Sequence, residues 1–100
     1  MGNYIPKIER NPAKEDALKL IARYMTVDVP KIYRTPSDKA LAIIFCKKLF
    51  KEVMCSNLSP LECAENYLEW VFEINRKKGG RDYTYYIWED VIGDIVSLMS

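Results

Sequence analysis

The sequence contains no histidine and no long hydrophobic run. Histidine is the commonest general base near neutral pH, so its absence removes the usual partner of a cysteine or serine nucleophile. The longest uninterrupted apolar stretch, residues 40–46, is far shorter than the roughly 20 residues that cross a bilayer. We therefore expect no enzymatic activity and no membrane partner.

Cysteine is also scarce, with Cys46, Cys55 and Cys63 at spacings that form no Cys-x-x-Cys pair. A structural zinc site takes four cysteine or histidine ligands, which this chain does not have. We expect buried free thiols, no metal and no cofactor. The first ten residues lack the apolar core of a secretory signal, which together with the free thiols predicts a cytoplasmic location.

The 100 residues are 49% hydrophobic and 29% charged, which fits one globular domain, residues 1–100. Helix starts are marked where a capping residue directly precedes a proline, because proline suits the first helical position. Three such pairs lie 24 residues apart, and Asp82 or Thr84 is placed to cap a fourth helix: Asn11-Pro12, Thr35-Pro36 and Ser59-Pro60. Together with the apolar periodicity, they predict helices over about 12–26, 36–54, 60–76 and 85–99. The expected fold is all-α, a four-helix antiparallel bundle-like domain with an extended N-terminal arm, residues 1–10.

The second predicted helix is apolar on every side over residues 40–46, a pattern typical of complete burial. Beyond it the helix carries Lys47, Lys48 and Lys51, and projection places Leu41 and Ile44 on the same side as Lys48 and Lys51. These two apolar side chains need a cover, which is the N-terminal arm, a second copy or a different protein. Contiguous exposed apolar surface marks interaction sites. The candidate protein interface is therefore Leu41, Ile44, Lys47, Lys48 and Lys51.

Charge is unevenly distributed, with a net charge of +5 through Cys55 and −4 from Ser56 onward. In one interpretation the basic second helix and the acidic third helix pair their rims across the groove between them. In the other the two halves form a dipolar surface that docks a partner or a second copy. The acidic stripe of the third helix also excludes it as a DNA-recognition helix, because carboxylates repel phosphates: Glu62, Glu65, Glu69 and Glu73.

The segment 76–86 is a candidate nucleic-acid site, because cations interleaved with aromatic rings can hold phosphates and stack unpaired bases. Its residues are Arg76, Lys77, Lys78, Arg81 and Tyr83. The alternative interpretation is a capped helix end whose tyrosines enter the core. The Gly79-Gly80 pair lacks the spacing of a phosphate-binding loop.

These observations predict a small, non-catalytic intracellular binding protein of the inhibitor, immunity or regulatory type that acts through protein–protein contact. The alternative is a nucleic-acid-binding accessory protein that uses segment 76–86.

Overall fold

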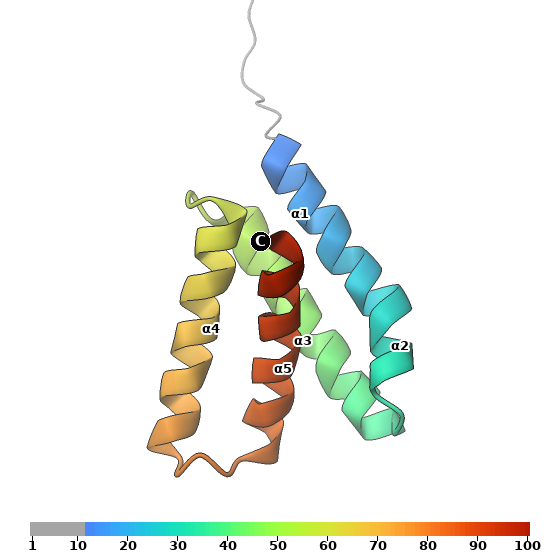
Figure 1. Cartoon of the computed structure of the whole chain (residues 1–100), viewed down its shortest axis with the longest axis vertical. Coiled ribbons are helices and arrows are strands. Elements are labelled where there is room, and N and C mark those ends of the chain that lie inside the picture. The colour runs from blue at the N-terminus through green and yellow to red at the C-terminus, as the bar shows by residue number, and fades with distance from the viewer. Residues whose placement is uncertain (1–11) are drawn as a thin grey trace, which may run out of the picture.

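The structure, a computed structural model, describes residues 12–100, and every regular element in this range is helical (Figure 1). In chain order the elements are α1 (Pro12–Arg23), the π-helical η1 (Tyr24–Asp28), α2 (Val29–Ile32), α3 (Pro36–Cys55), α4 (Pro60–Lys77) and α5 (Tyr83–Met99). The predicted all-α fold is confirmed, and the helices pack against one another. The expected arm, residues 1–10, lies outside the described residues.

The predicted caps begin the later helices. Thr35 Oγ1 accepts a hydrogen bond from the Asp38 N–H at 3.2 Å, and Ser59 Oγ accepts one from the Glu62 N–H at 3.2 Å. At the fourth helix the cap is Asp82, whose carboxylate accepts the Thr84 N–H at 3.0 Å, so α5 begins two residues earlier than expected. These bonds satisfy N–H groups that have no partner inside the helix.

The first helical segment does not end near Thr26 as the sequence suggested. It continues as η1 and α2 to Ile32, and the Val29 N–H bonds to the Tyr24 carbonyl five residues back. Pro30 has no N–H to offer the Thr26 carbonyl, and its ring crowds that carbonyl in a regular α-helix. A wider π turn just before the proline relieves this conflict. The non-helical connection to α3 is therefore short, because Lys31 and Ile32 are helical.

The C-terminus of α4 ends in a Schellman motif built on the two glycines. The Gly80 N–H bonds to the Asn75 carbonyl at 2.7 Å, and the Gly79 N–H bonds to the Arg76 carbonyl at 3.0 Å. Gly79 and Gly80 have φ of +88° and +67°, a left-handed conformation that favours glycine. The glycine pair therefore terminates a helix.

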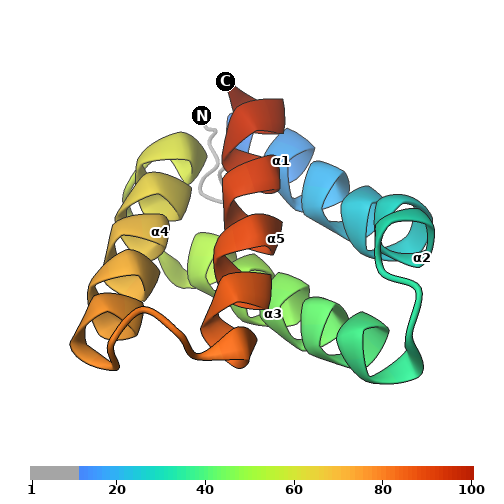
Figure 2. The ribbon, with the colours of Figure 1, turned by 60° about the horizontal axis from the view of Figure 1, so that its bottom comes forward.

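The helix α5 is central to the packing and contacts α1, α3 and α4. It forms an antiparallel hairpin with α4, while α3 crosses behind it and α1 lies along α3 (Figure 1, Figure 2). Trp88 of α5 stacks on Phe45 of α3, with 4.5 Å between ring centroids and 7° between ring planes. The fully buried aliphatic side chains around this stack include Leu49, Val91 and Ile95.

Candidate functional site

The predicted interface residues lie together on one side of α3, which we call the α3 outer face: Leu41, Ile44, Lys47, Lys48 and Lys51. Ile44 is 45% exposed, Leu41 is half-buried against the edge of the core, and the three lysines are exposed. The opposite side of α3 is buried. The described chain therefore leaves Ile44 open and covers Leu41 in part.

Residues 40–46 are not buried on every side, contrary to the sequence expectation. Ala42, Phe45 and Cys46 are buried, whereas Ala40 and Ile44 are exposed. The reason is that α3 contacts α1, α5, α4, α2 and η1, while its buried residues all lie on one side of the helix. The all-round apolar pattern therefore includes a surface of α3 that the described residues do not cover.

The lysines of the α3 outer face are not paired within the molecule. Lys47, Lys48 and Lys51 form no ion pair or hydrogen bond with any residue of 12–100, so the predicted pairing with the α4 glutamates is wrong. The glutamates face outward from α4 and are exposed: Glu62, Glu65, Glu69 and Glu73. Lys47 and Lys51 lie one helical turn apart, where like charges destabilise a helix by about 0.2–0.5 kcal/mol.

The basic segment after α4 has exposed cations but engaged tyrosines. Arg76, Lys77, Lys78 and Arg81 are exposed. Tyr83 donates its hydroxyl to Asp38 Oδ2 at 2.7 Å, and this bond raises the pKa of the Tyr83 phenol. The ring of Tyr85 stacks on Trp88. The Tyr86 hydroxyl donates a hydrogen bond to the Gly80 carbonyl. Part of this segment is therefore a capped helix end, and its tyrosine rings are only partly available for stacking with nucleic-acid bases.

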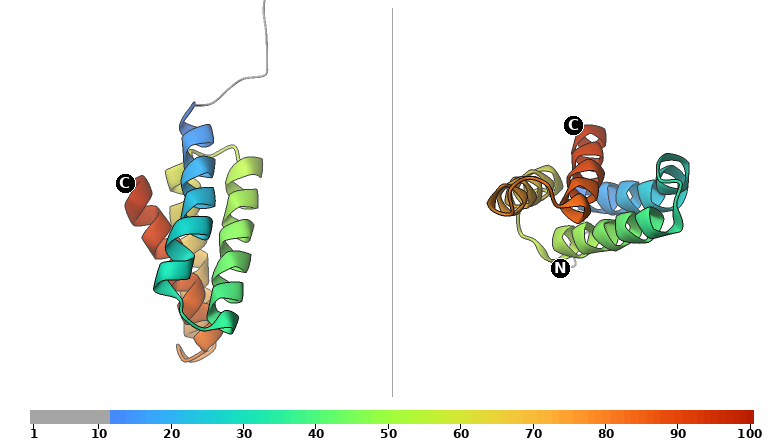
Figure 3. Two further views of the ribbon diagram at one scale, coloured as in Figure 1. Left: turned by 90° about the vertical axis from the view of Figure 1, so that its right-hand side faces the viewer. Right: turned by 90° about the horizontal axis from the view of Figure 1, so that it is seen from below.

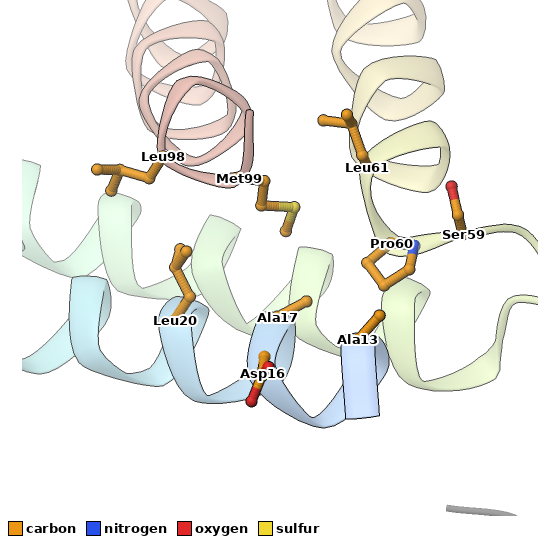
Figure 4. Close-up of a pocket in the computed structure, with 9 residues that line it drawn as sticks. All are labelled: Ala13, Asp16, Ala17, Leu20, Ser59, Pro60, Leu61, Leu98 and Met99. Carbon is orange, nitrogen blue, oxygen red and sulfur yellow. The ribbon is translucent and has the colours of Figure 1, made fainter. Parts of the chain in front are cut away.

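Two cavities lie between the first helical segment and the C-terminal end of α5. At one end is a cavity of about 310 Å³ between α1, the start of α4 and the end of α5, where Ala17 and Leu20 face Leu98 and Met99 (Figure 4). Asp16 lies at its edge, with the carboxylate directed away from the α5 side chains. At the other end is a cavity of about 300 Å³ between η1, α2 and α5, lined by Tyr24, Asp28, Ile32, Asp94, Ser97 and Leu98. Leu98 borders both cavities. We call this feature the α1/α5 groove.

A buried polar cluster lies beside the groove. Tyr24 donates its hydroxyl to Asp94 Oδ2 at 2.7 Å, across 70 residues of sequence. Burial first, and then the charges of Asp90 and Asp94, raise the pKa of Tyr33, whereas the neighbouring Tyr24 hydroxyl lowers it. The buried Tyr33 hydroxyl forms no hydrogen bond of good geometry within residues 12–100. Sequence analysis missed this cluster, because no local pattern links residues so far apart.

The cysteines are free, and one of them departs from the prediction. Cys46 and Cys63 are buried, but Cys55 is exposed at the last turn of α3, on its solvent side. Burial raises the pKa of Cys46 to about 12 and also raises that of Cys63, which keeps both thiols protonated and poorly nucleophilic at neutral pH. Residues 12–100 contain no group of three or more acidic or cysteine side chains arranged to hold a metal ion.

No helix within residues 12–100 combines the length and the hydropathy needed to cross a membrane. A scan against protein-family models, a search of curated proteins and a search of solved structures found no match. The α3 outer face and the α1/α5 groove are the surfaces that remain as candidates for function.

Proposed function

We propose that this protein is a non-catalytic binding protein whose α3 outer face docks a partner protein with an acidic rim around an apolar contact. The observation that carries the proposal is Ile44, 45% exposed between lysines that pair with nothing in the described chain. An apolar centre with a charged rim is the common anatomy of a protein interface. The exposed thiol of Cys55 on the same helix is consistent with the proposed cytoplasmic location.

The combination of one apolar and three basic side chains on the α3 outer face favours a protein partner over a nucleic acid. Phosphates would engage Lys47, Lys48 and Lys51 but would leave Ile44 without a contact. An acidic protein surface with one apolar side chain satisfies all four residues. A second copy of this chain is the alternative occupant.

Ile44→Asp and Lys47→Glu/Lys51→Glu test the α3 outer face. Ile44 is better suited than Leu41, because an aspartate at the half-buried position 41 would also perturb the core. The matched control is Phe72→Asp on α4, which carries a similarly exposed apolar side chain on a different helix. Circular dichroism and the unfolding midpoint verify that all variants fold.

Affinity capture from the native source, followed by titration of the purified partner, provides the readout. We expect the wild type and Phe72→Asp to bind the same acidic protein and both α3 variants to lose it. Binding that falls with rising salt is expected for the lysine rim. Equal capture by all variants contradicts the proposal, and a wild type that self-associates through Ile44 makes the partner a second copy.

The nucleic-acid alternative is tested with a labelled single-stranded oligonucleotide at about 50 mM salt, where phosphate contacts are strong. We expect no binding. Binding that is lost in Lys77→Glu/Arg81→Glu and kept in Ile44→Asp would favour the basic segment instead.

A further inference from the structure

The α1/α5 groove combines two cavities with an apolar rim. Leu98 is 55% exposed where the cavities meet, and Ile32 is 48% exposed at the far end. Leu20 and Met99 line the first cavity and are only partly buried. Side chains of this size are costly to leave in contact with water, at about 25 cal/mol for each Å² of apolar surface. The groove is thus a concave apolar surface without a described cover.

The charge of the groove has one sign. Asp16, Asp28 and Asp94 line it, and neither cavity has a lysine or arginine in its lining. The Asp94 carboxylate receives one hydrogen bond, from Tyr24, and no cation within residues 12–100 pairs with it. The carboxylates along α5 repel one another. Burial first, and then the charges of Asp94 and Glu89, raise the pKa of Asp90. The lining of the groove therefore includes three acidic side chains and no basic one.

A buried phenol lies near these carboxylates, outside the lining of either cavity. Tyr33 is 6% exposed, and its buried hydroxyl forms no hydrogen bond of good geometry within residues 12–100. An unpaired buried hydroxyl costs free energy that a bonded one does not. It lies near the carboxylates of α5, whose charges contribute to its raised pKa. Near the acidic end of the groove, Tyr24 bonds to Asp94, whereas Tyr33 lines neither cavity.

We propose that the α1/α5 groove binds a basic amphipathic helix of a partner protein. The apolar face of that helix packs on Leu20, Ile32 and Leu98, and its lysines or arginines reach Asp16, Asp28 and Asp94. The described wall from Ala13 to Ile32 is one helical run about 28 Å long, which matches a partner helix of about 18 residues. Docking of an amphipathic helix in an apolar groove is a recurring mode of recognition.

This groove is separate from the α3 outer face. The C-terminal end of α5 and the helix α3 lie on opposite sides of α1 (Figure 3). The inference therefore goes beyond the proposed function, and each stands or falls alone.

The test uses the full chain and a fluorescently labelled peptide of about 18 residues, made of leucine and lysine with one apolar and one basic face. Fluorescence anisotropy measures its affinity for the wild type and for Asp16→Asn/Asp28→Asn/Asp94→Asn. The amide oxygen at position 94 still accepts the Tyr24 hydroxyl, so the buried hydrogen bond is kept. The matched control removes the same number of charges from the exposed stripe of α4, in Glu65→Gln/Glu69→Gln/Glu73→Gln.

We expect the groove variant to bind the peptide at least about tenfold more weakly and the α4 variant to bind within about twofold of the wild type. Leu98→Ser weakens binding through lost apolar contact, and Lys47→Glu/Lys51→Glu leaves it unchanged. A peptide with glutamine in place of every lysine binds at least about tenfold more weakly.

Three results would overturn the inference. Equal losses in the groove and α4 variants would mean that only net charge attracts the peptide. Equal affinity for the glutamine peptide would mean that the carboxylates recognise nothing. Self-association of the wild type that is abolished by the groove variant would make the occupant a second copy and not a different protein.

Discussion

The α3 outer face presents Ile44 among three lysines of a single helix, whereas the α1/α5 groove gathers Asp16, Asp28 and Asp94 from three elements around Leu98. The first surface is the solvent side of one helix and is basic, and the second is concave and acidic. Both leave large apolar side chains partly exposed. The difference shows two routes to a docking surface: a helix face that its neighbours leave uncovered, and a hollow that exists only after distant segments meet.

Leu49→Ala compared with Ile44→Ala separates the two sides of α3 and should give the largest effect. Leu49 is fully buried, so its truncation is expected to lower the free energy of unfolding by about 2–5 kcal/mol. Ile44→Ala is expected to cost less than about 1 kcal/mol, because this side chain is partly in water already. Urea denaturation followed by circular dichroism measures both values. Similar losses would mean that something covers Ile44 in solution.

Alkaline pH should lower the stability of the fold through the two phenols beside the groove, Tyr24 and Tyr33. Burial and the Asp94 hydrogen bond raise the pKa of Tyr24, and burial with nearby carboxylates raises that of Tyr33. Because the folded state holds these phenols protonated, their stabilisation is complete below the unfolded pKa of about 10 and declines as pH rises above it. The decline is at most about 1.4 kcal/mol per pH unit for each phenol that ionises only on unfolding.

Urea midpoints measured between pH 7 and pH 11 would record this decline. The control is Tyr24→Phe/Tyr33→Phe, which should flatten the profile. A residual slope is expected from Cys46 and Tyr67, whose pKa values burial raises to about 12. An unchanged profile in the double variant would contradict the assignment of the loss to the groove wall.

The two phenols beside the groove should respond in opposite ways to loss of the hydroxyl. Tyr24→Phe removes a hydrogen bond to the Asp94 carboxylate and is expected to lower the free energy of unfolding by about 1 kcal/mol. This loss is smaller than that expected for a fully buried hydrogen bond to a charged group, because Asp94 is exposed. Tyr33→Phe removes a buried hydroxyl that has no described partner, so it should be neutral or stabilising. Thermal unfolding of both variants measures the difference. A loss in Tyr33→Phe as large as that in Tyr24→Phe would reveal a partner for the Tyr33 hydroxyl.

The fold was predictable where the signals are local. Thr35 and Ser59 precede prolines and bond to N–H groups three residues later, so the cap pattern placed the starts of α3 and α4 correctly. The end of the first helix, predicted near Thr26, was wrong, because the sequence pattern does not show that a π turn before Pro30 lets the helix continue. The interpretation of residues 40–46 failed for a related reason. An apolar stretch reports a preference for burial, and only the packing shows how much of it is met.

The candidate sites differ in the same way. Leu41, Ile44 and the lysines could be grouped from helical periodicity, because they share one side of one helix. Asp28 and Asp94 are far apart in sequence and meet only when η1 packs beside α5. Tyr24 is the first residue of the π turn η1, whose position could not be inferred from the sequence pattern. A groove of this kind requires the tertiary arrangement.

The smallest expected effect concerns the cost of the basic rim itself. Lys47→Gln relieves the repulsion from Lys51 one turn away and should raise the free energy of unfolding by about 0.2–0.5 kcal/mol at low salt. The gain should vanish near 1 M salt, where the Debye length is about 3 Å. Precise urea titrations at both salt concentrations make the measurement. If Lys47→Gln stabilises the fold and also weakens partner binding, the lysines serve recognition. If Lys47→Gln destabilises the fold, the lysines have a structural role, and the α3 outer face loses its physical basis as a docking surface.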